Sequence, residues 1–211
     1  DKVSKQVAYL LMNPQHQAVY CWRYHNGDII INTKIGDLSK EILSLSFTPY
    51  TSSLMIRREC YEALGGFDEN FRRHQDFEFL LRFFEKFSIG VVEEPLVEII
   101  GNEVNNALEC EELEKLKKQF LIQFEMHIDR IDKKEPGFRK MVFARHYSLV
   151  FWSYIKHARF LSGLRVFLAY SKISGSLTFL ICVGAYLKKY VKTKRKKYVQ
   201  KYKNKNGCVF L

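Results

Sequence analysis

The pattern of apolar and polar positions changes character near residue 102. Before this point, helix-like spacings alternate with short β-rich runs, whereas after it apolar residues recur almost only at the helical period of 3.6. The first part therefore predicts a mixed α/β arrangement and the second an all-helical region. We expect three parts, residues 1–102, 103–187 and 188–211, the last of which is a basic tail.

The first part alternates predicted helices with predicted strands. Helical spacing over residues 2–12 predicts an inner face made of Val3, Val7, Leu10 and Leu11. β-rich runs on both sides of Asn26-Gly27 predict a hairpin. The remaining predicted elements are a short helix capped by Asp37 or Ser39, a buried strand over 51–57, a helix over 59–64 closed by Gly65, an amphipathic helix over 76–87, and an extended stretch over 89–100 interrupted at Glu94-Pro95.

The second part reads as helices separated by Pro, Gly and Ser. A charged amphipathic helix is predicted over 109–131, and Pro136-Gly137 breaks the chain after it. Ser162-Gly163 and Ser174-Gly175-Ser176 are the next predicted breaks. Between the first and second breaks, one helix face is expected to point inward through Phe143, Tyr147, Val150, Tyr154, Ala158 and Leu161.

Residues 173–187 carry no charge and are followed by a tail rich in Lys and Arg. A membrane-spanning helix needs about twenty apolar residues, so this stretch predicts a buried or interfacial helix rather than a span. The adjacent cations favour docking on an anionic membrane surface. A basic tail that simply stays in water fits the same pattern.

Composition and charge narrow the class of protein. The hydrophobic fraction of 47% and aromatic fraction of 15% supply a core and exclude a disordered, collagen-like or coiled-coil chain. The net charge of +11 favours anionic partners such as lipid headgroups, nucleic acid or phosphorylated ligands. The 5 cysteines are scattered without a close pair, so they predict reduced thiols rather than a zinc site or a disulfide framework.

An ordered series of motifs lies in residues 48–102. It consists of a strand ending in Arg57-Arg58, then Gly65-Gly66-Phe67-Asp68-Glu69, Gln75-Asp76 with Glu78 and Arg82, Ile89-Gly90, and Glu94-Pro95-Leu96-Val97. The series resembles the acceptor half of family 2 glycosyltransferases, GT-A-fold enzymes that move a sugar from a nucleotide sugar. The resemblance covers about residues 1–102. It implies an α/β fold class, a partial GT-A-type mixed sheet with flanking helices, followed by an all-helical C-terminal region.

Asp76 is the candidate catalytic residue. An inverting glycosyl transfer needs a carboxylate to deprotonate the acceptor hydroxyl, and the resemblance implies that Asp76 is this base. Its predicted place at a helix start favours the ionised form. The alternative from the residue alone is that Asp76 merely caps the helix.

The candidate acceptor-binding residues surround this position. Gly65 and Gly66 fit either a turn that closes a helix or a close backbone approach to a ligand. Asp68 and Glu69 fit either the acceptor site or the cap of the next turn, and Gln75 precedes the base. Glu78 and Arg82, four residues apart, predict a structural ion pair. The basic run of Arg57, Arg58, Arg72, Arg73 and His74 could meet a diphosphate, although a solvated surface explains most of it.

Three features depart from the family pattern. Gln75 replaces the first of two acids, and Asn102 lies near the position where many relatives carry a His. The chain has no Asp-x-Asp signature, whose carboxylates hold Mg²⁺ or Mn²⁺ in the family. The resemblance therefore implies this cation in the full-length enzyme, with its ligands mostly absent from this chain and no metal ligand assigned within it. We expect the chain to be the C-terminal portion of a transferase and inactive alone.

Two function classes remain open on the sequence. The first is a glycosyltransferase that moves a sugar from a nucleotide-sugar donor to a glycan or lipid-linked acceptor in bacterial surface polysaccharide synthesis, such as capsule or lipopolysaccharide. The resemblance implies a cytoplasmic enzyme, peripheral at the inner face of the plasma membrane. The alternative is a non-enzymatic basic module that binds anionic membrane or nucleic acid through the Tyr-interleaved tail. Because no nucleic-acid-binding motif is present, we expect no nucleic-acid partner.

Overall fold

The computed structural model describes residues 1–25, 27–48, 50–71, 73–100 and 108–205. The chain divides into two compact units, Asp1–Leu108 and Glu109–Leu211, and each is described by itself. Asn102 and the predicted boundary at residues 102–103 lie outside the described residues. So do Asn26 of the predicted hairpin turn, Arg72 of the basic run and Cys208.

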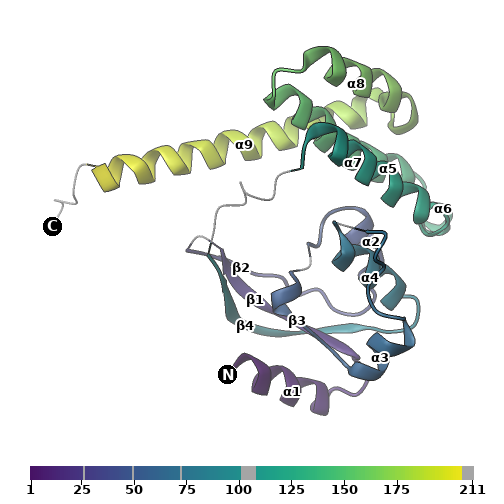
Figure 1. Cartoon of the computed structure of the whole chain (residues 1–211), viewed down its shortest axis with the longest axis vertical. Coiled ribbons are helices and arrows are strands. Elements are labelled where there is room, and N and C mark those ends of the chain that lie inside the picture. Colours follow the sequence, from purple (N-terminus) through teal and green to yellow (C-terminus); the bar gives the residue numbers. More distant parts are fainter. Residues whose placement is uncertain (26, 49, 72, 101–107, 206–211) are drawn as a thin grey trace. The chain divides into compact units, whose positions relative to one another are not determined.

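The first unit is a small mixed sheet flanked by helices (Figure 1). Its elements in chain order are α1 (Lys2–Met12), β1 (Ala18–His25), β2 (Asp28–Ile30), α2 (Ser39–Leu43), the 3₁₀ turn η1 (Thr51–Ser53), β3 (Leu54–Ile56), α3 (Arg58–Ala63), α4 (Gln75–Phe83) and β4 (Ile89–Ile99). This arrangement confirms the predicted partial GT-A-like α/β fold for the described residues.

Strand β1 is the centre of the sheet. β4 runs parallel to it, with Ala18 opposite Ile89 and His25 opposite Ile99. β2 and β3 pair antiparallel with different halves of β1. Since β4 occupies one edge of β1 along its whole length, the two antiparallel strands β2 and β3 share the other edge of β1. The predicted hairpin is confirmed in the pairing of β1 with β2.

Helix α1 covers one face of this sheet, and α2 and α4 lie on the other (Figure 1). The predicted inner face of α1 was wrong. Leu10 is buried, but Val3 and Leu11 are 63% and 72% exposed. The helix is instead turned so that the buried Gln6 side chain donates to the backbone oxygens of Val19, at 3.3 Å, and Ser53, at 2.9 Å.

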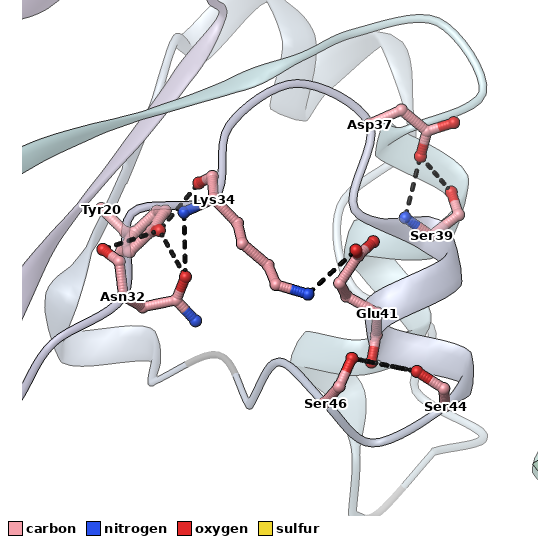
Figure 2. Close-up of polar contacts among 8 residues, drawn as sticks. All are labelled: Tyr20, Asn32, Lys34, Asp37, Ser39, Glu41, Ser44 and Ser46. Atoms are coloured by element: carbon pink, nitrogen blue, oxygen red, sulfur yellow. Dashed lines mark hydrogen bonds and ion pairs between the residues drawn. The ribbon is translucent and has the colours of Figure 1, made fainter.

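The loop between β2 and α2 is tied to the sheet by polar contacts (Figure 2). The Tyr20 hydroxyl donates to the backbone oxygen of Lys34 at 2.8 Å, and the Lys34 ammonium donates to the Glu41 carboxylate at 3.0 Å. The N-cap residue of α2 is Leu38, not the predicted Asp37 or Ser39, but Asp37 just before it accepts from the backbone N–H of Ser39 at 2.8 Å. These contacts hold α2 beside the central strand.

Two strand predictions need correction. Residues 51–57 do not form one buried strand, because Thr51–Ser53 is a 3₁₀ turn and only Leu54–Ile56, which is half-buried, pairs with β1. β4 is continuous through Glu94-Pro95 rather than interrupted. Pro95 instead lies opposite Trp22 of β1, and the pairing register of the two strands shifts on both sides of Trp22.

The second unit contains only helices among its described residues. They are α5 (Cys110–Gln123), α6 (Glu125–Lys134), α7 (Phe138–Lys156), α8 (Phe160–Ser174) and α9 (Ser176–Lys205). α7 is central and contacts the other four helices. Its predicted inner residues Phe143, Tyr147, Val150 and Tyr154 are buried, which confirms most of that stripe. α9 continues through residue 187 without a break.

The predicted break at Pro136-Gly137 is confirmed between α6 and α7, but other helix ends differ from the predicted ones. The single helix expected over 109–131 ends at Phe124, whose buried ring packs against Phe120 with centroids 5.1 Å apart. α7 ends before Ala158, which has a φ of 57°. Ser162-Gly163 therefore lies inside α8, where a Cβ on Gly163 would come within 3.0 Å of Ile155. Leu161, predicted to face inward, is 85% exposed.

The break at Gly175 is confirmed. None of the helices in the described residues combines the length and the apolar character that a membrane-spanning segment requires.

Candidate functional site

An open pocket of about 180 Å³ lies in the first unit. Its wall comes from η1, β3, α3, α4 and the turn that follows α3. The lining residues are Thr51, Leu54, Ile56, Tyr61, Phe67, Asp76, Phe79 and Leu80. Six of these are apolar or aromatic, and Asp76 is the one carboxylate among the described residues that line the pocket. Such a composition, apolar walls with a sparse polar group, is typical of small-molecule sites.

Three rings form one side of the pocket. The ring centroids of Phe67 and Phe79 are 5.2 Å apart, and Tyr61 lies 5.5 Å from Phe79 and 5.8 Å from Phe67. Tyr61 and Phe67 remain more than one-third exposed even though aromatic side chains are usually covered. The pocket therefore offers a bound molecule an aromatic surface.

Helix α4 places Asp76 in this wall. The helix begins at Gln75, and the residue before it, His74, has a φ of 60°. This left-handed conformation is uncommon outside glycine, and it turns the chain directly into the first helical residues. Asp76, Phe79 and Leu80 are spaced i, i+3 and i+4, so they share the face of α4 that lines the pocket.

The Asp76 carboxylate is influenced by a backbone hydrogen bond and by its burial in the pocket wall. Oδ1 accepts a hydrogen bond of 3.0 Å from the backbone N–H of Phe77, one of the N–H groups that a helix start leaves without a helical partner. Burial raises the pKa of Asp76, and this outweighs the lowering by backbone hydrogen bonds. The helix start predicted a carboxylate favoured in its ionised form, but desolvation dominates, because an apolar wall disfavours charge.

The glycine turn is fixed to α4 through Arg82. Its guanidinium donates to Glu78 at 2.6 and 2.8 Å, to the backbone oxygen of Leu64 at 2.6 Å and to that of Gly66 at 2.8 Å. Glu78 is 1% exposed. The ion pair predicted from the i, i+4 spacing is present, and it joins the turn after α3 to the helix that carries Asp76.

Gly65 and Gly66 form part of this turn. Both have positive φ, 71° at Gly65 and 73° at Gly66, as predicted for a turn that closes a helix. A Cβ on Gly66 would lie 2.9 Å from the Tyr61 hydroxyl, so the close approach at Gly66 is to a pocket residue of the chain itself. Neither glycine is among the residues that line the pocket.

The remaining predicted acceptor-binding residues lie outside the pocket lining. Asp68 accepts from the backbone N–H and the side-chain amide of Asn70, both at 2.9 Å, which is the turn-capping alternative. Glu69 is exposed in the same turn, and Gln75 is exposed at the start of α4. Of the six predicted site residues, the structure places Asp76 in the pocket wall.

The basic run does not gather around the pocket in the described residues. Arg57 donates to the backbone oxygen of Leu10 at 2.6 Å, which ties β3 to α1. Arg58 is exposed beside Glu62, and Arg73 is exposed. The His74 ring packs edge-on against Phe77, with centroids 4.7 Å apart.

Sequence reasoning missed the aromatic wall. Tyr61, Phe67 and Phe79 were not among the predicted site residues. A signal was present for Phe79, because it lies three residues after Asp76 on a predicted helix. Tyr61 and Phe67 come from separate elements, and only the folded turn after α3 brings them to the same place.

The described residues contain no group of three or more His, Cys, Asp or Glu side chains that could hold a metal ion. This part of the chain therefore offers no ligand cluster for the divalent cation that the resemblance implies. The described cysteines, Cys21, Cys60, Cys110 and Cys182, are all free, as predicted.

The mixed sheet, in which β4 is parallel and β2 and β3 are antiparallel to β1, is consistent with a partial GT-A-like α/β fold. The sequence model of the glycosyltransferase-like family 2 matches residues 13–210, and the chain belongs to this family. The match extends through the helical unit, beyond the half of the chain that carried the resemblance. No curated protein matches the chain.

The raised pKa of Asp76 leads to a prediction for the chain itself. The folded state holds the Asp76 proton more tightly than the unfolded state does, so this residue makes the fold less stable as pH rises from the ordinary aspartate range through the raised pKa. Asp76→Asn should therefore increase the free energy of unfolding at pH 7, and the difference should vanish at acid pH.

Denaturant unfolding of the purified chain across a pH series measures this effect. Asp37→Asn is the control, because it makes the same chemical change just before α2, where the Asn oxygen can still accept from the backbone N–H of Ser39. A lower stability of Asp76→Asn at pH 7 than of the unaltered chain would show that the ionised carboxylate stabilises the fold, contrary to our account.

Proposed function

We propose that this chain provides the acceptor site and the general base of an inverting glycosyltransferase. The observation that carries the proposal is Asp76, the one carboxylate among the described residues that line a mostly apolar and aromatic pocket. Membership of the glycosyltransferase-like family 2 supports transfer of a glycosyl group in general. It favours this function over the alternative of a non-enzymatic basic module.

The proposed step is one displacement. The acceptor hydroxyl oxygen attacks the anomeric carbon of the donor sugar, and its proton passes to the Asp76 carboxylate. The bond between the anomeric carbon and the diphosphate oxygen breaks, and the nucleoside diphosphate leaves with the electron pair. A raised pKa suits this role, because a stronger base takes the proton more readily while it remains deprotonated at the working pH.

The aromatic wall would orient the acceptor. A ring of Tyr61 or Phe67 can cover the less polar face of an acceptor, while Asp76 is the polar group that fixes one hydroxyl. Arg82 is a positioning residue in this proposal. It holds the turn that precedes Phe67 against α4 through the backbone oxygens of Leu64 and Gly66.

The remaining details of the proposal rest on the resemblance. They are a nucleotide-sugar donor, a divalent cation held by carboxylates from outside this chain, and a glycan or lipid-linked acceptor in surface polysaccharide synthesis such as capsule or lipopolysaccharide. A cytoplasmic location follows from the same resemblance. We propose that the acceptor extends beyond the pocket and contacts residues close in the chain to Phe67 and Asp76. They are Gly65, Gly66, Asp68, Glu69 and Gln75.

The proposal predicts that the chain alone releases no nucleotide from UDP-, GDP- or dTDP-sugars with Mn²⁺, because it contains no Asp-x-Asp pair. Joined to a nucleotide-binding half that carries this pair, it should form a product whose anomeric configuration is opposite to that of the donor. Nucleotide release and the NMR coupling of the anomeric proton measure the two outcomes. Turnover by the chain alone, or a retained configuration, would contradict the proposal.

A further inference from the structure

Helix α9 has two opposite faces that differ in their surroundings. The inward face packs against α7 and α8. The ring of Phe179 is fully buried between Phe151 and Phe167, with centroids 5.9 and 5.5 Å away, and Tyr190 lies 5.5 Å from Trp152. Phe179 and Tyr190 are eleven positions apart, three helical turns, so they mark one line along the helix.

The opposite face of α9 is exposed and changes from apolar to cationic along its length. Leu177, Leu180 and Ile181 are 74%, 54% and 63% exposed in the first two turns. Two to four turns further on, Lys188, Lys192 and Arg195 are exposed. Positions 177, 181, 184, 188, 192 and 195 follow at spacings of three or four residues, so they lie along the same outward side of the helix.

The described helices of the second unit leave the apolar half of this face exposed to solvent. Single exposed apolar residues are ordinary, but three large ones on adjoining positions of one helix form a patch. The cationic half extends past α7 and α8 in Figure 1. An apolar patch followed by cations on one side of a helix matches the surface of an anionic bilayer, where acyl chains lie beneath charged headgroups.

We propose that the outward face of α9 docks on an anionic lipid membrane and lies along its surface. Leu177, Leu180 and Ile181 enter the headgroup region, and Lys188, Lys192 and Arg195 contact anionic headgroups. This inference stands apart from the proposed sugar transfer, because it uses a different unit and a different surface. It refines the membrane docking expected from the uncharged stretch and the basic tail by assigning it to one helix face.

The apolar half of the outward face of α9 favours a membrane over a soluble polyanion as the binding partner. Nucleic acid would be held by the cations and the tyrosine rings of the tail, and its binding would not depend on Leu177 or Ile181. A bilayer responds to both halves. Because the attraction of the cations is screened over about 8 Å at physiological ionic strength, added salt should weaken binding to the bilayer, while the apolar contacts retain part of it.

Co-sedimentation of the full chain with vesicles tests the proposal. Vesicles of phosphatidylcholine with about one-third phosphatidylglycerol are compared with pure phosphatidylcholine over a NaCl series. Each cation near an anionic surface contributes about a factor of five to partitioning, so Lys188→Gln, Lys192→Gln and Arg195→Gln together should weaken binding on the order of 100-fold. Leu177→Ser with Ile181→Ser should weaken it at least about tenfold.

The matched control removes three charges elsewhere on the same unit. Lys118→Gln, Lys133→Gln and Lys134→Gln change exposed cations of α5 and α6 and should alter binding only a few-fold. Equal binding to neutral and anionic vesicles would overturn the proposal. So would an equal loss from the control variant, or vesicle binding that is indifferent to the serine substitutions. All the altered side chains are exposed, so circular dichroism should show unchanged folding.

Discussion

Arg82→Leu is expected to reduce the free energy of unfolding of the chain by about 3–5 kcal/mol, the usual cost of removing one partner from a buried ion pair. Glu78 is 1% exposed, and the change takes the guanidinium away from its carboxylate. The backbone oxygens of Leu64 and Gly66 lose their donors at the same time. Denaturant unfolding followed by circular dichroism measures the change.

The matched control is Arg58→Leu on the neighbouring helix α3. Arg58 and Glu62 also form an i, i+4 pair, but their side chains are 88% and 63% exposed and the charged atoms lie 3.8 Å apart. Exposed pairs of this kind contribute about 0.3–0.5 kcal/mol, so this variant should change stability little. Equal effects of the two substitutions would show that the Glu78–Arg82 pair does not anchor the turn.

The order of elements in the first unit was largely predictable, because their local signals agree. The Asn26-Gly27 hairpin, the helix closed by Gly65 and the amphipathic α4 each follow from turn chemistry and spacing. The face of α1 was not predictable. Apolar spacing favoured Val3 and Leu11, whereas two backbone oxygens of the sheet region select the buried Gln6.

In the second unit, apolar periodicity predicted the helices better than it predicted where they end. Periodicity identified α7 and most of its buried stripe, but it extended the first helix through Phe124 and carried the stripe past Ala158. Both positions keep helical spacing in the sequence. At these two helix ends the structure has a buried Phe124 ring against Phe120 and a left-handed backbone at Ala158, and a periodic pattern encodes neither.

The sequence pointed to Asp76, which lines the pocket, but not to the aromatic residues beside it. Asp76 could be chosen because a carboxylate at a helix start lies within a recognisable series of motifs. The pocket needs Tyr61 from α3, Phe67 from the following turn and Phe79 from α4 to meet. Arg82 also donates to the backbone oxygens of Leu64 and Gly66 in the turn before Phe67, and residue types alone do not reveal hydrogen bonds to backbone oxygens.

We propose Asp76 as the group that takes the proton from the acceptor hydroxyl. Asp76→Asn preserves the size of the side chain and an oxygen that can accept from the N–H of Phe77. It removes the basic carboxylate, because an amide does not accept the proton at neutral pH. Loss of a general base costs typically about 10²–10⁴-fold in rate. Binding of the donor should persist, since the change leaves the net shape of the pocket intact.

The most direct measurement is the rate of sugar transfer at saturating donor and acceptor, in a transferase that joins this chain to a nucleotide-binding half. Asp37→Asn, on the loop before α2, is the control and should transfer at the unaltered rate. We expect Asp76→Asn to transfer about 10²–10⁴-fold more slowly, while its dissociation constant for the nucleotide sugar stays within about twofold of the unaltered enzyme. Transfer by Asp76→Asn within about tenfold of the unaltered rate would place the base elsewhere and contradict the account.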